Sequence, residues 1–574
     1  MRFLAAPLAA LLALFGISTA PPDGTPVRVV VLHTNDLHGQ CLPRDAPGRK
    51  DAKIGGFAAI QAAVEREREA AKASGAHVVL VDAGDWYQGT PEGNLAKDGA
   101  PGALVVDWMG RVRYDAVAIG NHEFDFGVAN VEKLLARARF PVLGANIVRP
   151  APNAANGEKS ATTVPFAKPY AVVERGGVRL AFVGLCSSET PRMTVAGRTG
   201  DLVFEDDTES ARRWFDRARK EADLVFLLTH CGKEVDERLA RRVPECPVIF
   251  GGHSHTRLEK AIVVDHEASA MSSNPWADGV PPRTYVVQSG AKAENLDRVA
   301  LEIDPATKRI AKVDARLVPL LLEDVGEDAA TKRWLAEETA PVATEMAKVL
   351  ATVVPPERPA PKGRQTDPTH NLVCDAMLDG VRKVDHGVVA AFGNATGVRT
   401  KVETGPFSLR NAYEIVPFDN TVVVMTLGGR DLVDLLGEGV SGDRPRLIAA
   451  GIEGSVAPRA DGTVDASDVR IGGEPIRPES RYRVAANSFI ATGKGGLGAF
   501  ERGVDRNDTG LLVRDLLGDY VAAKGKLALD DELRLRVKRD GATASRREGA
   551  AASREGSAAS REGSAARPAT APAH

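Results

Sequence analysis

The segment Gly120-Asn121-His122-Glu123-Phe124-Asp125 carries side chains suited to metal binding and to acid–base chemistry. It follows the apolar residues 116–119, which predict a buried strand, and a helical pattern resumes after Gly127. The segment therefore lies where a strand ends, at the edge where open α/β sheets place their ligands. Asn121 offers a neutral oxygen, His122 offers a proton or a ligand nitrogen, and Asp125 can orient that histidine.

Four other clusters of metal-binding side chains also follow apolar runs. In chain order they are Asp36 and His38 after residues 27–32, Asp85 after 77–81, His230 after 224–228, and His253 with His255 after 248–250. Each cluster alone is a weak signal, because such residues are usually surface groups, helix caps, turn residues or hydrogen-bonded core histidines. Together with the segment 120–125 they hold five of the eleven histidines of the chain. Strand ends of one sheet converge, so the joint pattern indicates a metal centre.

The donor types favour two ions rather than one. Mixed imidazole, carboxylate and amide donors suit zinc, manganese or iron better than the all-oxygen sites of calcium. Seven candidate donors exceed the needs of one four- to six-coordinate ion, but they fill two sites if one carboxylate bridges. Such a pair, roughly 3.5–4 Å apart, can hold a hydroxide between the ions and clamp a phosphoryl oxygen.

Two α/β domains are predicted to position these residues. Residues 27–320 alternate strand-like and helical patterns, and further strands are expected at 179–185, 421–426 and 481–486. A helical linker is expected at residues 321–361, with the helical pattern running from 323 to 354 and a proline-rich end at 355–361. A second α/β domain follows at residues 362–538.

The two ends of the chain have different compositions. Residues 1–20 resemble a secretory signal, with Arg2, an apolar stretch and the small residues Ser18-Thr19-Ala20. We therefore expect an exported protein, periplasmic or extracellular, with a retained N-terminal anchor as the alternative. Residues 539–574 repeat Ser-Arg-Glu-Gly among small residues, which predicts a disordered tail, with a surface tether as the alternative.

The overall composition excludes some partners. A net charge of -3, with 43% hydrophobic and 26% charged residues, gives no basic excess for a nucleic-acid polymer. Small anions and single nucleotides remain possible partners, because a local metal charge can bind them. No later apolar run is long enough for a stable membrane span. The five cysteines leave at least one thiol over, and their spacing identifies no disulfide pair. The oligomeric state is not predicted.

The order of the motifs resembles a known family. Asn35-Asp36-x-His38-Gly39, Gly84-Asp85, the segment 120–125, an isolated His230 and Gly252-His253-Ser254-His255 are similar to the calcineurin-like metallophosphoesterases. Within them, the chain resembles the secreted 5'-nucleotidase / UDP-sugar hydrolase family over residues 27–538. The resemblance implies a four-layer α/β/β/α metallophosphoesterase domain followed by a smaller α/β 5'-nucleotidase-type C-terminal domain.

Carried over by motif, the resemblance implies two divalent metal ions, zinc or manganese, that share one carboxylate. One ion would be bound by Asp36, His38, Asp85 and His255, and the other by Asp85, Asn121, His230 and His253. His122 would stabilise the transition state or protonate the leaving oxygen, and Asp125 would hold its imidazole charged and aimed. A metal-bridging hydroxide would attack the phosphorus in line.

The C-terminal domain matches the family in outline. Asn394 and Arg399 lie in a loop that binds phosphate in the family, and Phe418, Asn420 and Phe489 lie in segments whose two aromatic rings sandwich the nucleobase. Without the resemblance, each phenylalanine reads as an ordinary core residue. Three departures from the family pattern concern the substrate. Ala395 and Thr396 replace glycines of the family, Gly493-Lys494-Gly495-Gly496 lacks the carboxylate that holds ribose, and the upstream phosphate-binding arginines match poorly at Arg364 and Asn371.

Removal of phosphate from nucleoside 5'-monophosphates or related nucleotides is therefore the leading hypothesis. The alternative is hydrolysis of UDP-sugars, 2',3'-cyclic nucleotides or a non-nucleotide phosphoester by the same metal centre, which the missing carboxylate favours. A binding protein without turnover is a third hypothesis. It would predict lost metal ligands, and none is missing.

Overall fold

The computed structural model describes residues 24–150, 164–194, 197–440, 446–459 and 464–538. The predicted signal and the predicted tail lie outside these residues. Two compact units divide the chain: the first comprises residues up to Thr352 together with Gly405–Asp419, and the second comprises Val353–Thr404 and the residues from Asn420 onward. The segment Gly405–Asp419 therefore packs with the first unit, although the sequence assigns it to the C-terminal domain.

The first sheet of the first unit supplies three of the predicted strand ends. Its spatial order is β17-β16-β1-β4-β5-β6. The strands are β1 (Val27–Thr34), β4 (His77–Asp82), β5 (Ala116–Ala118), β6 (Val142–Leu143), β16 (Asn295–Ile303) and β17 (Ile310–Pro319). β1, β4, β5 and β6 are parallel, so their carboxyl ends share one edge of the sheet.

The second sheet supplies the other two strand ends. Its order is β14-β15-β13-β12-β10-β9. The strands are β9 (Tyr170–Arg175), β10 (Val178–Cys186), β12 (Leu224–His230), β13 (Val248–Gly251), β14 (Ile262–Asp265) and β15 (Arg283–Val287). β10, β12, β13 and β15 are parallel, and His230 is the last residue of β12.

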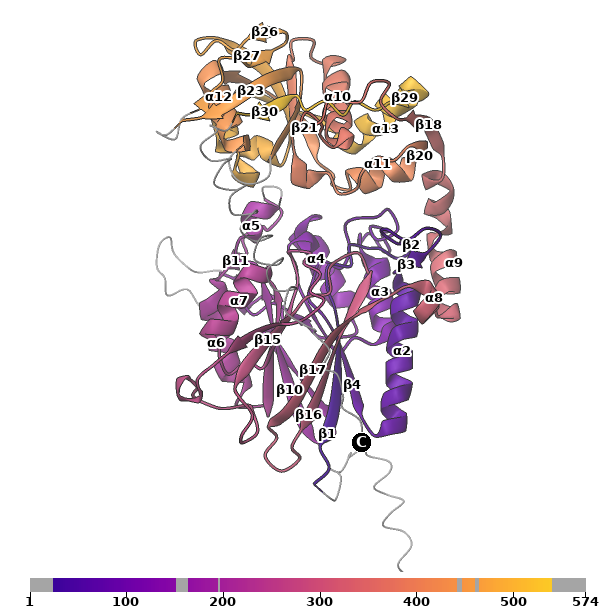
Figure 1. The fold of residues 1–574 in the computed structure, drawn as a ribbon, viewed down its shortest axis with the longest axis vertical. Helices are drawn as coiled ribbons and strands as arrows, with labels where there is room; N and C mark the ends of the chain where they lie inside the picture. The colour runs from indigo at the N-terminus through magenta and orange to yellow at the C-terminus, as the bar shows by residue number, and fades with distance from the viewer. Residues whose placement is uncertain (1–23, 151–163, 195–196, 441–445, 460–463, 539–574) are drawn as a thin grey trace, which may run out of the picture. The chain divides into compact units, whose positions relative to one another are not determined.

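Alternation along the strands packs the two sheets face to face. Val29 and Val31 of β1 join Phe226 and Leu228 of β12 in one buried core. The intervening side chains face helices: α2 (Phe57–Ser74), α3 (Ala103–Val112) and α4 (Val128–Arg137) cover the first sheet, and α6 (Asp207–Ala218) and α7 (Lys233–Arg242) cover the second. Figure 1 shows α2 and α6 on opposite sides of the paired sheets. The predicted four-layer α/β/β/α arrangement is confirmed.

The predicted helical stretch at 323–354 differs from the structure at its end. Helices α8 (Leu322–Val325) and α9 (Ala329–Met346) are followed by strand β18 (Val349–Val354). The three valines and one threonine of β18 are β-branched and favour an extended backbone. The helix therefore ends about eight residues before the position that the sequence pattern predicts.

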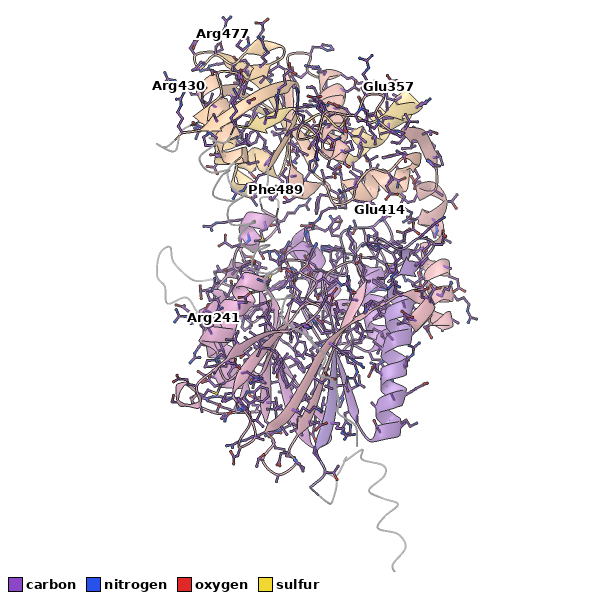
Figure 2. The ribbon with its side chains drawn as sticks, viewed as in Figure 1. Arg241, Glu357, Glu414, Arg430, Arg477 and Phe489 are labelled. Carbon is purple, nitrogen blue, oxygen red and sulfur yellow. The ribbon has the colours of Figure 1, made fainter. Side chains whose placement is uncertain are left out.

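Helix α11 (Leu409–Ile415) links the segment Gly405–Asp419 to the first unit through charge. Its Arg410 donates to both carboxylate oxygens of Glu92, one of them at 2.8 Å, and Glu92 is buried. Glu414 of the same helix is labelled in Figure 2. Burial and the nearby Glu92 carboxylate raise the pKa of Glu414, while Arg410 opposes that rise. A buried charged contact thus explains why this segment groups with the first unit.

The second unit has its own sheet and core. Its five-stranded sheet has the order β22-β19-β27-β21-β28. The strands are β19 (Ala390–Asn394), β21 (Thr421–Gly428), β22 (Leu447–Ala450), β27 (Arg481–Asn487) and β28 (Val504–Leu512). Helix α12 (Gly429–Val440) packs Leu432, Leu435 and Leu436 into a core with Phe392 of β19. Helices α10 (Pro368–Arg382) and α13 (Val513–Lys524) pack together. The smaller α/β domain is confirmed.

Two further observations concern the cysteines and the possibility of a membrane-spanning helix. All five cysteines are buried free thiols. Across the described ranges, every helix falls short of the length or the apolar character that crossing a bilayer requires.

Candidate metal centre

His230 is the last residue of β12, and the other candidate ligands lie in the loops that directly follow β1, β4, β5 and β13. Five of the seven have backbone φ angles in the left-handed region: Asp36 (51°), His38 (47°), Asp85 (58°), His253 (78°) and His255 (52°). Non-glycine residues rarely adopt this conformation, and such strain concentrates at functional sites. The loops are therefore shaped to direct these side chains, at a cost in backbone energy.

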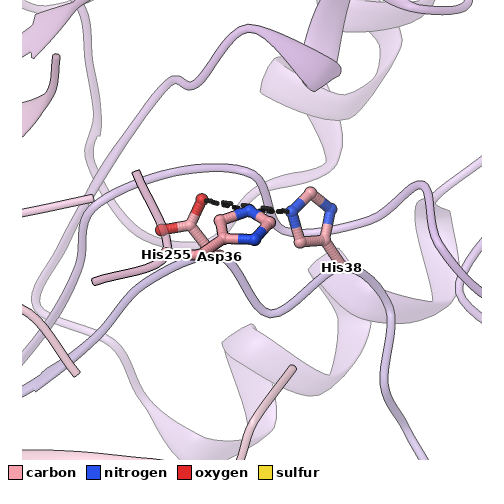
Figure 3. A group of neighbouring side chains, drawn as sticks. All are labelled: Asp36, His38 and His255. Atoms are coloured by element: carbon pink, nitrogen blue, oxygen red, sulfur yellow. Dashed lines mark hydrogen bonds and ion pairs between the residues drawn. The ribbon is translucent and has the colours of Figure 1, made fainter. Parts of the chain in front are cut away.

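Asp36, His38 and His255 form the first group of donors. The ligand atoms of the three lie within 4.8 Å of one another. His38 Nε2 lies 2.9 Å from His255 Nε2, which lies 3.3 Å from Asp36 Oδ1. Figure 3 shows the carboxylate and the two imidazoles converging. Two facing ring nitrogens and one carboxylate oxygen provide three donors for a single cation.

Asp85, His230 and His253 form the second group, and Asn121 joins it. The ligand atoms of the three titratable residues again lie within 4.8 Å of one another. The Asn121 carboxamide oxygen lies 3.2 Å from His230 Nε2 and 2.8 Å from His253 Nδ1. The structure therefore brings together four side chains from the ends of β4, β5, β12 and β13.

The Asp85 carboxylate lies between the two groups. Its Oδ2 is 3.1 Å from His230 Nε2 in the second group and 3.9 Å from His38 Nε2 in the first. Asp36 Oδ1 is in turn 4.0 Å from His230 Nε2. One carboxylate that reaches both groups is the geometry expected of a ligand bridging two ions.

Hydrogen bonds from outside the two groups orient the imidazoles. His38 Nδ1 donates to the Gln88 carbonyl at 2.9 Å, and His230 Nδ1 donates to the Ala83 carbonyl at 2.7 Å. Because each Nδ1 donates to a carbonyl, each Nε2 is the nitrogen that faces the site and can bind a cation in its deprotonated form. Metal-binding histidines are commonly held in this way.

Asn35 orients the first carboxylate. Its amide nitrogen donates to Asp36 Oδ2 at 2.5 Å and to the Gly290 carbonyl at 2.7 Å. Its amide oxygen accepts from the Ser289 backbone at 2.8 Å. The sequence places Asn35 in a motif but indicates no role for Asn35 or for the Gln88 carbonyl. Backbone partners of this kind leave no signal in one sequence.

Two glycines allow the loops to meet. A Cβ added at Gly84 would lie 2.7 Å from the Gly120 nitrogen and 2.9 Å from His230 Nδ1. Gly84 also has φ of 97°, which side chains disfavour. At Gly120 an added Cβ would overlap the Asp85 carboxylate. Any larger residue at either position would push two ligand-bearing loops apart.

Two buried carboxylates give the site a negative charge that a cation would neutralise. Asp36 and Asp85 are 0% and 1% exposed, and their ion-pair partners among the described residues are imidazoles. Burial opposes ionisation, but His255 and His230 hold the pKa of Asp36 well below its usual range. Burial likewise opposes the ionised form of Asp85, and His230 and His122 hold its pKa well below the usual range.

The pKa values of the two imidazoles in the second group are shifted in opposite directions. Burial disfavours a charged His230, yet the Asp85 and Asp36 carboxylates raise its pKa to about 10. Burial and the His230 charge lower the pKa of His253 to about 4. In the metal-free chain, a proton on His230 thus balances part of the negative charge of the Asp36 and Asp85 carboxylates. A bound cation would balance the same charge. The donor set suits two divalent ions with nitrogen and oxygen ligands.

His122 and Asp125 form a pair beside the donors. His122 Nδ1 donates to Asp125 Oδ2 at 2.7 Å, and His122 Nε2 lies 4.0 Å from Asp85 Oδ2. The His122 backbone N–H donates to Asp85 Oδ1 at 2.9 Å. Both residues lie on or next to the short 3-10 helix η1 (His122–Phe124) that follows β5. The pair can therefore present a proton, or a positive charge, to a group held by the donors.

The five predicted substrate residues do not gather in one unit. Asn394 ends β19, where its Oδ1 accepts from Asn487 at 2.8 Å. Asn420, Arg399 and the half-buried Phe489 also belong to the second unit. Phe418 belongs to the first unit, where its ring lies 5.5 Å from the His122 ring with 20° between the planes. The aromatic sandwich of Phe418 and Phe489 stays a prediction.

Two family models match the chain. Residues 29–257 match the model described as calcineurin-like phosphoesterase, and residues 347–502 match the model described as 5'-nucleotidase, C-terminal domain. The first match contains all the candidate metal ligands, and the second contains all five predicted substrate residues.

Curated relatives match over nearly the full chain. The human protein named 5'-nucleotidase is 28% identical over 565 residues, which cover 91% of this chain and 92% of the human protein. Protein UshA of Escherichia coli strain K12 is 25% identical over 535 residues, which cover 87% of this chain and 92% of UshA.

Solved structures share the fold. A 5'-nucleotidase precursor from Thermus thermophilus gives a TM-score of 0.74 at 28% identity, and the match covers 89% of this chain and 100% of that one. The sulfate thiohydrolase SoxB from the same species gives a TM-score of 0.68 at 22% identity, over 91% of this chain and 98% of that one. The likeness to SoxB concerns the fold alone.

Proposed function

Because the chain belongs to the calcineurin-like phosphoesterases that carry a 5'-nucleotidase C-terminal domain, we propose that it removes phosphate from nucleoside 5'-monophosphates or related nucleotides. It is a metal-dependent phosphoric ester hydrolase, as its family is, and the family uses a dinuclear divalent metal centre. The observation that carries the proposal is the pair of buried donor groups on either side of Asp85, with the His122–Asp125 pair beside them.

The seven donors are proposed to hold two ions. Asp36, His38, Asp85 and His255 would hold one, and Asp85, Asn121, His230 and His253 the other, each as zinc or manganese. When bound, such a pair of ions polarises a phosphoryl oxygen and lowers the pKa of bound water toward neutrality. The hydrogen bonds that His38 and His230 donate to the Gln88 and Ala83 carbonyls keep these two imidazoles in their orientation.

His122 is proposed to act on the phosphoryl group and on the leaving oxygen. Its Nδ1 is occupied by Asp125, so Nε2 is the nitrogen that faces the donors. A protonated His122 there stabilises the negative charge that grows in the transition state and can give its proton to the departing alkoxide. Asp125 holds the ring in the orientation that this transfer requires.

Residues of the C-terminal domain are proposed to select the substrate. Phe418 and Phe489 would stack on a nucleobase, since every base has a flat π face. Both rings are half-buried, which supports this role over that of a fully buried core residue. Arg399 and Asn394 would contact the phosphate, and Asn420 would contact the nucleoside. These five assignments rest on the motif positions.

A second substrate class is favoured by one observation. The turn that includes η5 (Lys494–Gly496) supplies glycines and a lysine after Phe489 and no carboxylate. The carboxylate that the family places within this turn to hold ribose is therefore absent from the turn itself, which favours UDP-sugars, 2',3'-cyclic nucleotides or a non-nucleotide phosphoester as alternatives.

Export to the periplasm or the extracellular space is proposed from the sequence of residues 1–20, which has the charged, apolar and small-residue parts of a signal peptide. Mass spectrometry of the mature N-terminus from a fractionated cell would test it. A mature chain in the exported fraction that begins near residue 21 is expected, and an intact Met1 in the cytosolic fraction would contradict it.

Phosphate release tests the proposed reaction. The purified chain is incubated with AMP, UMP, UDP-glucose, 2',3'-cyclic AMP and 4-nitrophenyl phosphate, each with and without a chelator. The products are also separated by ion-exchange chromatography, because the first hydrolysis of UDP-glucose or of the cyclic nucleotide gives phosphomonoesters and no free phosphate. We expect chelator-sensitive release that is fastest for a 5'-monophosphate. Release that survives complete chelation would contradict the metal mechanism. Equal kcat/KM for AMP and 4-nitrophenyl phosphate would leave the hydrolysis intact but contradict nucleotide selection.

A further inference from the structure

Glu123 lies beneath the candidate metal centre and faces two of its loops at once. It is 0% exposed, in the first turn after β5. Its Oε2 accepts from the Asp85 backbone nitrogen at 3.0 Å and from the Gly120 nitrogen at 2.7 Å, and its Oε1 accepts from the Trp86 nitrogen at 2.8 Å. One side chain therefore joins the loop after β4 to the loop after β5.

The joined loops carry the residues on which both donor groups depend. Asp85 lies between the two groups, and its φ of 58° is a conformation that needs outside support. The loop after β5 carries Asn121 and His122, and the His122 backbone N–H donates to Asp85 Oδ1. Without the Glu123 contacts, the Asp85 backbone could relax from its left-handed conformation. The distance between the Asp85 and Asn121 side chains would then no longer be fixed.

The chemistry of these contacts requires a carboxylate. Three N–H donors approach two oxygens, so both oxygens must accept, whereas a carboxamide of the same shape has only one oxygen. With both oxygens occupied by backbone groups, Glu123 is not itself a metal ligand. Burial and the Asp85 carboxylate raise the pKa of Glu123, and the Trp86 and Gly120 N–H groups oppose that rise.

We propose that Glu123 is a positioning residue that holds the Asp85 loop and the Asn121–His122 loop together, and that it thereby sets the affinity for both metal ions. This inference rests on the proposed function, because it takes Asp85 as the ligand shared by the two ions. Nothing in the motif assigns Glu123 this task; the three backbone contacts do.

Metal affinity measured apart from activity is the direct test. Mn²⁺ is titrated calorimetrically into the metal-free full-length chain and its Glu123→Gln variant. Loss of an outer hydrogen-bonding partner typically weakens metal binding by about 10–100-fold, and we expect a loss of this size for both ions. With saturating Mn²⁺, kcat for phosphate release should also fall while KM stays within about threefold, since Glu123 touches the metal loops and not the substrate.

Glu245→Gln is the matched control. Glu245 is also buried and accepts from the Ser272 backbone and hydroxyl at 3.1 and 2.9 Å, but it precedes β13, whereas His253 follows that strand. This variant should lower the melting temperature of the metal-free chain and leave the Mn²⁺ affinity unchanged. Equal loss of Mn²⁺ affinity in both variants would overturn the inference, because it would mark a general effect of destabilisation.

Glu123→Asp covers the case in which Glu123→Gln does not fold. It keeps the charge and both oxygens but shortens the reach by one methylene, so Mn²⁺ binding should again weaken. Wild-type affinity in any folded Glu123 variant would overturn the inference. A wild-type chain that binds fewer than two Mn²⁺ ions would instead contradict the proposed function, so the two failures are distinguishable.

Discussion

The metal centre and the substrate residues are built in different ways. The seven candidate ligands follow five parallel strands of the first unit, their donor atoms lie a few ångströms apart, and outer hydrogen bonds orient several of them. The substrate residues lie at the end of β19 and in several separate loops, four in the second unit and Phe418 in the first. Among them, Asn394 has a local network, which joins Asn487 and Thr396.

This difference separates the reaction from its specificity. Side chains fixed at strand ends give a defined geometry for hydrolysis, whereas loop residues can change with little cost to the fold. The phosphoester chemistry of this chain is therefore anchored more firmly than the identity of its nucleotide.

Asp85→Asn should have the largest effect, because it removes the charge that both donor groups share. A loss of several kcal/mol of charge stabilisation corresponds to a fall in kcat of about 10³-fold or more. The fall should be the same for AMP and 4-nitrophenyl phosphate. Asp304→Asn, at an exposed turn of the first unit, is the control and should keep full activity. A wild-type kcat for Asp85→Asn would refute the ligand assignment.

The loss of kcat in His122→Asn should depend on the leaving group of the substrate. General-acid catalysis typically contributes about 10²–10⁴-fold, and a nucleoside alkoxide needs the proton far more than a nitrophenolate does. We expect kcat for AMP to fall by about 10²–10³-fold and kcat for 4-nitrophenyl phosphate to fall by about tenfold or less. Equal losses on both substrates would assign His122 to charge stabilisation alone.

Metal binding should depend on pH through His230. Its pKa of about 10 in the metal-free chain means that a cation must displace its proton. One displaced proton raises the apparent affinity by about tenfold per pH unit, so Mn²⁺ should bind about 100-fold more tightly at pH 9 than at pH 7. Calorimetry at the two pH values measures this directly. An affinity that is constant across this range would count against His230 as a ligand.

The same pKa values predict the stability of the metal-free chain. A raised pKa for His230 stabilises the fold fully below pH of about 6.5, and that contribution is lost as the pH rises to about 10. The lowered pKa of His253 affects stability at lower pH. Its contribution to the free energy of unfolding is present above pH of about 6.5 and is lost as the pH falls toward 4. Thermal melts in chelator should therefore lose stability as the pH rises from about 6.5 toward 9, and bound metal should reduce that decline.

Phe489→Ala should have the smallest effect and should be confined to nucleotides. Base stacking on an aromatic side chain is worth about 1–3 kcal/mol, so KM for AMP should rise by about 5- to 160-fold with kcat within about threefold. KM for 4-nitrophenyl phosphate should not change. Phe500→Leu, in the buried core of the second unit, is the control for lost packing. An unchanged KM for AMP would make Phe489 a packing residue.

The sequence predicts the fold well where apolar patterns are strong. The predicted starts and ends of β1, β4, β10, β12 and β13 lie within two residues of the structure, because each is a continuous apolar run between polar loops. β18 is missed, since a helical pattern continues into its valines. The placement of Gly405–Asp419 with the first unit is also missed, because the contact of Arg410 with Glu92 spans 318 residues.

The metal centre shows what a single sequence can and cannot give. Residue types and strand ends predict which side chains gather, as Asp36 with His38 and His255, and Asp85 with His230 and His253. The roles of Asn35, the Gln88 carbonyl and Glu123 depend on backbone groups, which look alike in every residue. The left-handed φ angles at five ligands are only partly predictable, because Asp and His adopt them more often than most residues but the residue type does not say which of them will.

Diffraction from Mn²⁺-loaded crystals, recorded at the manganese absorption edge, tests the central claim most directly. We expect two anomalous peaks roughly 3.5–4 Å apart, each within bonding distance of the Asp85 carboxylate. One peak should lie beside His38 and His255, and the other beside His230 and His253. A single peak at full occupancy, or two peaks that do not share Asp85, would contradict it.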